Sequence, residues 1–192
     1  MNKPMDPQFP RRQRGAALMV VLILLLIMTL LGLASLRGTL MDQRMSANTY
    51  DRNLSLQEAE AALREGEAVL APGVASSSFT SACTSGLCSQ PVAAAGTLDR
   101  WSDTSFNNKW QNVSSSLITS LSVEPGAGTP QYFIEYMGVA PNFAGCDQVD
   151  PILPQCLTPR YRVTARNADP TVAGDRSMVY LQSTYASISP SP

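Results

Sequence analysis

An uncharged, apolar run of 21 residues, AALMVVLILLLIMTLLGLASL, occupies positions 16–36. A helix rises about 1.5 Å per residue, so this run would span about 30 Å, the thickness of the hydrocarbon core of a bilayer. A helix buried in a soluble core would normally be shorter and would carry a polar face. The apolar region of a secretory signal peptide has only about 7–15 residues, and a small-residue cleavage site follows it. The run therefore predicts a helix that spans a membrane.

The charges on the two sides of this run differ in sign. Residues 1–14 hold four basic residues and one acidic residue, a sum of +3, and the rest of the chain holds ten basic and fourteen acidic residues, a sum of −4. A basic segment directly before an apolar run keeps the N-terminus in the cytoplasm. We therefore expect a single span of a bacterial inner membrane, with residues 37–192 on its outer side.

The helical pattern continues beyond the apolar run. No proline occurs between Arg37 and Leu70, and Pro72-Gly73 is the first firm stop, so we expect one helix over residues 16–70. One side of its second half carries an apolar stripe, made of Leu56, Ala59, Leu63, Gly66 and Leu70. The charged residues are expected on other faces: Asp51, Arg52, Glu58, Arg64, Glu65 and Glu67. The stripe is shorter than the three to four heptads of a coiled coil, which favours a helix that packs on its own domain.

Residues 71–128 are rich in Ser, Gly, Ala, Thr and Pro and show no sustained period. They predict loops with short pieces of structure, with a helical turn or an edge strand over residues 114–121. The three aromatic residues Trp101, Phe106 and Trp110 are expected to anchor this region to the core.

Three strands are expected late in the chain, over residues 131–139, 160–166 and 177–185. They are rich in aromatic and β-branched residues or alternate between apolar and polar positions. No helix separates them, which favours an antiparallel sheet. The sequence therefore predicts an α+β fold, in which the stripe of the long helix covers one face of a sheet of at least three strands.

Four cysteines follow the membrane segment: Cys83, Cys88, Cys146 and Cys156. An even number on the exported side suggests two disulfides, for which four cysteines allow three pairings. Short loops favour Cys83–Cys88 and Cys146–Cys156, but the sequence does not decide. Their spacing matches no common zinc site. Asp147 and Asp150 could ligate calcium, although solvated turn acids explain them more simply.

The composition also excludes classes of function. The chain has no histidine, so it has neither Ser-His-Asp nor Cys-His nucleophiles, nor histidine-ligated zinc. Its net charge of −1 offers no basic surface for nucleic acid. We therefore expect neither an enzyme nor a nucleic-acid-binding protein, and no cofactor.

Three segments of the chain resemble a known family. Residues 13–18 (QRGAAL) with the apolar run behind them, and residues 57–63 (QEAEAAL), look like the start of a type IV pilin-like protein, in particular a minor pilin of the PilX type. Residues 179–185 (VYLQSTY) are similar to the last strand of that family. The N-terminal resemblance covers about residues 11–66 and implies the pilin fold, with a long helix packed on a sheet.

The resemblance implies how the chain is processed and where it acts. In that family a prepilin peptidase cuts after the glycine, here Gly15, and methylates the new N-terminus, here Ala16. Residues 1–15 would be the leader, residues 16–36 the membrane and filament-core segment, and residues 71–192 the outward-facing globular domain. Such minor pilins prime assembly and sit at or near the tip of a filament that supports twitching motility and adhesion. The implied partners are the prepilin peptidase, other minor pilins, the major pilin, the assembly machinery and a tip adhesin.

Two positions depart from the family pattern. Ala16 replaces the aromatic residue or methionine that major pilins usually have first, although cleavage depends more on the glycine. Val20 stands at the fifth mature position, where pilins usually have a glutamate that neutralises the free amine of the subunit ahead. A first subunit has no subunit ahead of it, so Val20 predicts a place at the filament tip. Two alternatives remain: a minor pseudopilin of type II secretion, and an anchored periplasmic binding domain that keeps residues 1–15.

Overall fold

The structure is a computed structural model that describes residues 15–92, 98–121 and 128–187. Most of the predicted leader, residues 1–14, lies outside the described residues. The chain divides into two compact units, Met1–Ala47 and Asn48–Pro192. The division falls within the long helix, so each unit is described by itself.

The first unit is the N-terminal part of helix α1, which extends over Ala16–Leu70, the bounds that the sequence predicts. Every side chain from Ala16 to Leu36 is exposed, and these side chains are apolar around the whole helix. Within the described residues, α1 is long and apolar enough to cross a membrane. A helix that is apolar on all sides cannot remain so in water, so this segment requires a lipid or protein environment.

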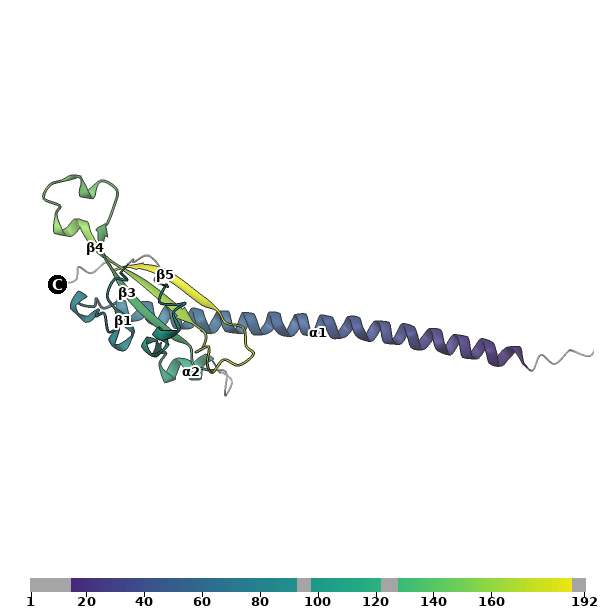
Figure 1. The fold of residues 1–192 in the computed structure, drawn as a ribbon. Helices are drawn as coiled ribbons and strands as arrows, with labels where there is room; N and C mark the ends of the chain where they lie inside the picture. The colour runs from purple at the N-terminus through teal and green to yellow at the C-terminus, as the bar shows by residue number, and fades with distance from the viewer. Residues whose placement is uncertain (1–14, 93–97, 122–127, 188–192) are drawn as a thin grey trace, which may run out of the picture. The chain divides into compact units, whose positions relative to one another are not determined.

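The second unit contains the end of α1 and a mixed sheet. Its long strands are β3 (Gln131–Pro141), β4 (Leu157–Arg166) and β5 (Tyr180–Ala186), which pair in antiparallel fashion in the order β3-β4-β5 (Figure 1). Two short strands pair with the other edge of β3: β1 (Leu87–Cys88) in parallel and β2 (Gln111–Asn112) in antiparallel fashion. The prediction of an α+β fold with three antiparallel strands is confirmed, and β1 makes the complete sheet mixed rather than antiparallel.

Short helices fill the connections. Helix α2 (Ser115–Leu121) occupies the segment for which the sequence left a helical turn or an edge strand open, so the helical alternative is correct. The 3-10 helices are η1 (Ser76–Ser78), η2 (Thr84–Gly86), η3 (Thr104–Lys109), η4 (Cys146–Gln148) and η5 (Pro154–Cys156).

The strand boundaries differ from the predicted ones for local reasons. The pairing of β3 with β4 continues past a register shift between Tyr136 and Val139, where Gly138 has a φ of 90°. Only glycine adopts this φ easily, so the strand can bulge there and go on pairing. Strand β5 begins at Tyr180 instead of residue 177, because the Asn167 side chain bonds the carbonyl of Ser177 and the N–H of Val179.

The main core lies between α1 and one face of the sheet. Its buried residues are Ala62, Leu70, Phe79, Val113, Tyr132, Ile134, Tyr161, Val163 and Ala165. Gly66 brings the helix close to the sheet: a Cβ at this position would lie 2.7 Å from Cγ1 of Val163. Small residues on the helix thus let the aromatic and branched side chains of the strands reach its backbone.

The buried face of α1 includes Ala59, Gly66 and Leu70 of the predicted stripe, and Leu63 packs against the core, but the face departs from the stripe at its start. Leu56 is 37% exposed, whereas Ser55 and Glu58 are buried. Placing Glu58 on another face was therefore wrong. It is buried because Arg176, from the connection between β4 and β5, lies against it.

A second cluster covers the opposite face of the sheet, here called the outer face, whose side chains include Phe133, Glu135, Arg162, Thr164, Arg166, Tyr180 and Gln182. Trp110 meets Phe133 edge-on at a centroid distance of 4.6 Å, and Phe106 packs on the same ring at 5.0 Å. Trp110 and Phe106 therefore anchor their loop to the sheet, as the sequence predicts. Trp101 contacts Tyr180 at 5.7 Å but remains 44% exposed, so it covers the core only in part.

Candidate processing and assembly site

The predicted processing residues lie at the start of the first unit. Gly15 directly precedes α1, and Ala16 is the first residue of the helix. Both are exposed, and within the described chain no atom would lie within 4 Å of a Cβ on Gly15. A backbone that is open on all sides at a glycine is accessible to a peptidase that binds the main chain closely.

Val20 lies in the second turn of α1, with 55% of its surface exposed. All neighbours on the helix from Ala16 to Leu36 are uncharged, so this part of the chain supplies no carboxylate near the N-terminus of the helix. The segment can therefore contribute apolar contacts to an assembly, but it cannot neutralise a neighbouring amine by itself.

The four cysteines lie in the second unit. Cys83 is bonded to Cys88 and Cys146 to Cys156, the pairing that short loops favour. The first bond is buried beside Trp110 and Phe133, and the second closes the connection between β3 and β4. Asp147 and Asp150 are exposed in that connection. In the described part of the chain, no group of three His, Cys, Asp or Glu side chains could hold a metal ion.

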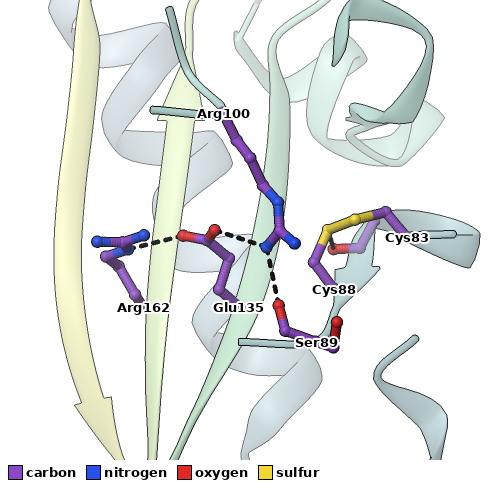
Figure 2. Close-up of a disulfide and its surroundings, with 7 residues drawn as sticks. Cys83, Cys88, Ser89, Arg100, Glu135 and Arg162 are labelled. Carbon is purple, nitrogen blue, oxygen red and sulfur yellow. Dashed lines mark hydrogen bonds and ion pairs between the residues drawn. A yellow bond between two sulfur atoms is a disulfide. The ribbon is translucent and has the colours of Figure 1, made fainter. Parts of the chain in front are cut away.

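A carboxylate that the sequence analysis did not single out lies on the outer face. Glu135 of β3 is 1% exposed and lies between two arginines (Figure 2). Nη1 of Arg100 donates to one carboxylate oxygen at 2.8 Å, and Nε of Arg162 donates to the other at 2.6 Å. Nη1 of Arg100 also donates to the carbonyl of Ser89, next to Cys88. The buried carboxylate is therefore fully paired, and it ties the first disulfide loop to the centre of the sheet.

A second buried ion, Arg166, lies at the C-terminal end of β4. The Arg166 side chain donates to Gln131 and Asn107, and its guanidinium lies 4.1 Å from the centre of the Trp110 ring. Burial lowers the pKa of Arg166, and Asp169 opposes that effect. A stacked and multiply bonded guanidinium fixes the position of the loop that carries Trp110.

A third ion group joins α1 to the connection before β5. Arg176 contacts Asp51 and Glu58, and the N–H of Ser177 donates to Asp51 at 2.7 Å. Burial raises the pKa of Glu58, although Arg176 opposes this, while the hydrogen bond from the Ser177 N–H lowers the pKa of Asp51. These contacts hold the globular domain on its helix.

The structure thus separates two kinds of predicted site residue. Gly15, Ala16 and Val20 belong to the exposed apolar part of α1, and the disulfides belong to the sheet unit. The buried charges were missed because a charged residue in a strand or helix looks solvated until its partner is known. In β3, Glu135 occupies a position on the face opposite the main core, where a charged residue is normally solvated. Its burial is explained by Arg100 and Arg162, which lie 35 and 27 residues away in the chain.

Comparison with known families agrees with this architecture. A family model described as PilX N-terminal matches residues 14–64, and one described as type IV pilus assembly protein PilX C-term matches residues 78–187. Searches of curated proteins and of solved structures each found no match. The PilX family consists of structural assembly proteins rather than enzymes, and its role implies contact with other pilins and with the assembly machinery. With its N-terminal apolar helix, its α+β domain and matches over both parts, the chain belongs to the PilX family of type IV pilus assembly proteins and is a membrane-anchored pilin.

Proposed function

We propose that this chain is a minor pilin that is cut after Gly15, methylated at Ala16 and placed first in a growing type IV pilus. In this role a prepilin peptidase removes residues 1–15 while the N-terminus faces the cytoplasm. Residues 16–36 then leave the inner membrane for the filament core. The match of the PilX N-terminal model from residue 14 onward and the exposed backbone at Gly15 support this processing site.

The proposed position at the filament tip rests on the valine at position 20. Each subunit added behind another brings its N-terminal helix into an apolar core, where an unpaired amine or carboxylate would cost several kcal/mol. A glutamate at the fifth mature position removes that cost by pairing with the amine of the subunit ahead. Val20 cannot form this pair, so the chain is disfavoured behind another subunit and tolerated in front.

The globular part would then face outward at the tip. Its compact unit begins at Asn48, and the domain proper follows the end of α1, over residues 71–192. The buried ion groups and two disulfides cross-link this domain internally. In this position it contacts the other minor pilins and the major pilin, presents a surface to a tip adhesin, and supports twitching motility and adhesion.

Introducing the missing carboxylate tests the proposal. Purified filaments from cells with the wild type, Val20→Glu or Val21→Glu would be labelled with gold-conjugated antibody against the chain and viewed by electron microscopy. We expect wild-type label at one end only and Val20→Glu label along the shaft as well. Val21→Glu makes the same chemical change one residue later, about 100° around the helix, so its label should not spread along the shaft.

Two results would overturn the proposal. Wild-type label along the shaft would show that Val20 does not restrict the subunit to the tip. Recovery of the chain with type II secretion components instead of pilins would assign it to a pseudopilin role.

A further inference from the structure

We propose that the outer face of β4 and β5 binds an acidic saccharide, with an aromatic end, a hydrogen-bonding centre and a cationic end. The proposal concerns the globular unit alone and does not depend on where the subunit sits in a filament. It rests on three residues of this face: Arg162 in β4, Gln182 in β5, and Trp101, which contacts Tyr180 of β5.

The aromatic end is a cavity of about 280 Å³ lined by Trp101, Thr164, Tyr180, Leu181 and Gln182. The chain has two tryptophans, and they differ in burial: Trp110 is part of the core, whereas Trp101 keeps 44% of its surface exposed beside this cavity. A large exposed aromatic surface next to a small hollow is typical of a ligand site. The apolar C–H face of a pyranose ring is a suitable partner for it.

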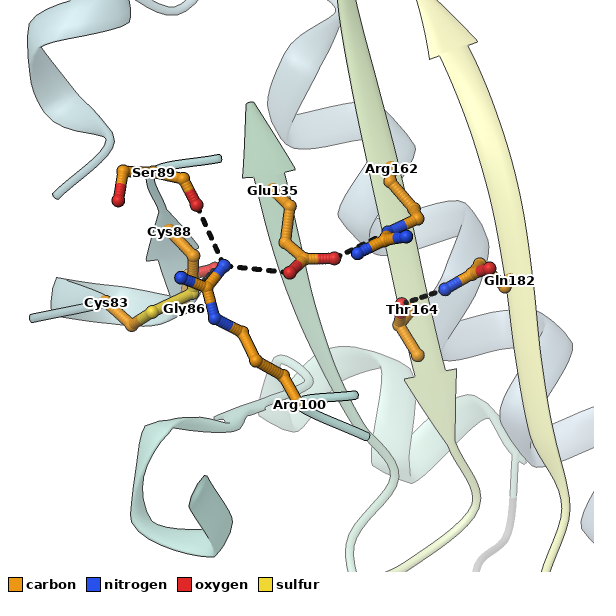
Figure 3. A network of polar contacts seen from close by, with 9 residues as sticks. All are labelled: Cys83, Gly86, Cys88, Ser89, Arg100, Glu135, Arg162, Thr164 and Gln182. Carbon is orange, nitrogen blue, oxygen red and sulfur yellow. Dashed lines mark hydrogen bonds and ion pairs between the residues drawn. A yellow bond between two sulfur atoms is a disulfide. The ribbon is translucent and has the colours of Figure 1, made fainter. Parts of the chain in front are cut away.

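The centre offers hydrogen-bonding groups of both kinds. Nε2 of Gln182 donates to Oγ1 of Thr164 at 3.1 Å, across β5 and β4 (Figure 3). Within the described residues, Oε1 of Gln182 has no hydrogen-bond partner, and the Thr164 hydroxyl still has a proton to donate. One acceptor and one donor, a few ångströms apart on a rigid sheet, match the neighbouring hydroxyls of a sugar.

The cationic end is Arg162, two residues from Thr164 on the same face of β4 and opposite Thr184 of β5. Its Nε is bonded to Glu135, while its two terminal nitrogens have no hydrogen-bond partner in the described part of the chain. Arg100 and Arg162 share the single carboxylate of Glu135, so this group keeps one positive charge in excess (Figure 2). The terminal nitrogens of an arginine are suited to bind a carboxylate.

The dimensions favour a short oligosaccharide. Tyr180 and Thr184 mark the two ends of the site along β5, and the four residue-to-residue steps between them extend about 13 Å. That is about the length of two linked sugar rings. A neutral sugar would not pair with the excess positive charge of Arg100 and Arg162. Nucleic acid would need more basic residues than this acidic domain provides.

Calorimetric titration of the full chain in detergent micelles tests the ligand class. The probes are digalacturonate, 3′-sialyllactose, neutral maltotriose and a tetraglutamate peptide. We expect one of the two acidic sugars to bind at least tenfold more tightly than maltotriose and the peptide. Binding of digalacturonate would point to a polyuronate source, and binding of sialyllactose to sialylated cell-surface glycans. Equal binding of maltotriose, tighter binding of the peptide, or no binding of either acidic sugar at millimolar concentration would overturn the proposal.

Variants of exposed residues test the location without threatening the fold. Gln182→Glu places a negative charge at the centre and should weaken binding of the acidic sugar about tenfold or more, because the new carboxylate repels the ligand and accepts the Thr164 proton that the sugar would otherwise bind. Thr184→Lys adds a cation beside Arg162 and should strengthen it. Gln57→Glu on α1 is the matched control for the charge change, and Phe143→Ala is the control for Trp101→Ala. Unchanged binding in Gln182→Glu and Trp101→Ala would contradict this site even if a sugar binds elsewhere.

Discussion

Nη1 of Arg176 lies 3.1 Å from Oε2 of Glu58, although 118 residues separate them in the chain. Glu58 projects from α1, and Arg176 belongs to the connection between β4 and β5, so this pair joins the helix to the far edge of the sheet. Asp51 and Ser55 contact the same guanidinium from earlier turns of the helix. One arginine thus ties the last strand to two turns of α1.

Removing this arginine should destabilise the globular unit strongly. In Arg176→Met the Glu58 side chain, which is 2% exposed, loses its ion partner, and we expect a loss of about 3 kcal/mol in the free energy of unfolding. Denaturant unfolding of the full chain in detergent measures it. The control is Arg64→Met, whose ion pair with Glu60 is exposed and should contribute less than about 0.5 kcal/mol.

A double variant tests whether the loss comes from the unpaired charge. Replacing both partners, as in Glu58→Leu with Arg176→Met, should recover most of the stability, because no charge then remains buried without a partner. If the double variant is as unstable as Arg176→Met alone, the arginine acts through some other contact.

The same carboxylate should give the stability a characteristic pH dependence. Because burial raises the pKa of Glu58, the folded state binds its proton more readily than the unfolded state does. Its contribution is therefore fully present below the ordinary glutamate pKa, about 4.3, and is lost as pH rises through the higher pKa of the folded state. Asp51 acts oppositely: its lowered pKa gives stability above its ordinary value, about 3.9, and that stability is lost at lower pH.

Melting temperatures of the wild type, Glu58→Gln and Asp51→Asn, measured from pH 7 down to about pH 2.5, separate these effects. We expect the wild type to gain stability relative to Glu58→Gln as pH falls from 7 toward 4.3, and Asp51→Asn to remove part of the decline below pH 4. Parallel curves for the wild type and Glu58→Gln over the whole range would contradict the account.

The close approach of α1 to the sheet depends on Gly66. An added Cβ would lie 2.7 Å from Cγ1 of the fully buried Val163 and 3.1 Å from Cδ2 of Tyr132, so Gly66→Ala should force the helix away and cost about 2–3 kcal/mol. This outweighs the gain of about 1 kcal/mol from the higher helix propensity of alanine. Gly38→Ala is the matched control: outside the helix's own backbone, the described residues place no atom within 4 Å of its Cβ position, so the melting temperature should not fall. Equal effects at the two positions would mean that the helix does not press on the sheet.

The two disulfides should differ in a way that loop length does not predict. Chain entropy alone gives about 2 kcal/mol for Cys83–Cys88 and about 3 kcal/mol for the longer loop of Cys146–Cys156. In the first bond both cysteines are buried and pack beside Trp110 and Phe133, whereas in the second only Cys156 is buried.

We therefore expect the double alanine variant of Cys83 and Cys88 to lose about 1 kcal/mol more than that of Cys146 and Cys156, since it also leaves a cavity beside Trp110. Thermal unfolding followed by tryptophan fluorescence measures both. A larger loss for the Cys146–Cys156 variant would show that loop length dominates after all.

The parts of the fold that the sequence predicted are those set by local patterns. The ends of α1 follow from the absence of proline before Pro72 and from the apolar run. The centre of β3 follows from its aromatic and β-branched residues, and that of β4 from alternation. Strands β1 and β2 have two residues each, too few for any period. They exist because β3 offers an edge and the disulfide loop and Trp110 are held against it.

The charged residues show where sequence patterns fail. Its charge placed Glu58 on a solvated face in the sequence-based prediction, and its place in an apolar spacing put Leu56 on the buried face. Arg176 reverses both assignments, since pairing with it draws Glu58 toward the sheet and turns Leu56 toward solvent. No pattern within the helix contains this information. For the processing residues, by contrast, Gly15 and Ala16 are local features and can be named from the sequence.

The most direct test of the central claim is the intact mass of the chain, isolated from cells with and without a prepilin peptidase. We predict a mature species in the first case that begins at Ala16 and is heavier by one methyl group, and an uncut chain in the second. A chain that still carries residues 1–15 in both cells would contradict the processing and filament role, and it would favour a domain that stays anchored in the membrane.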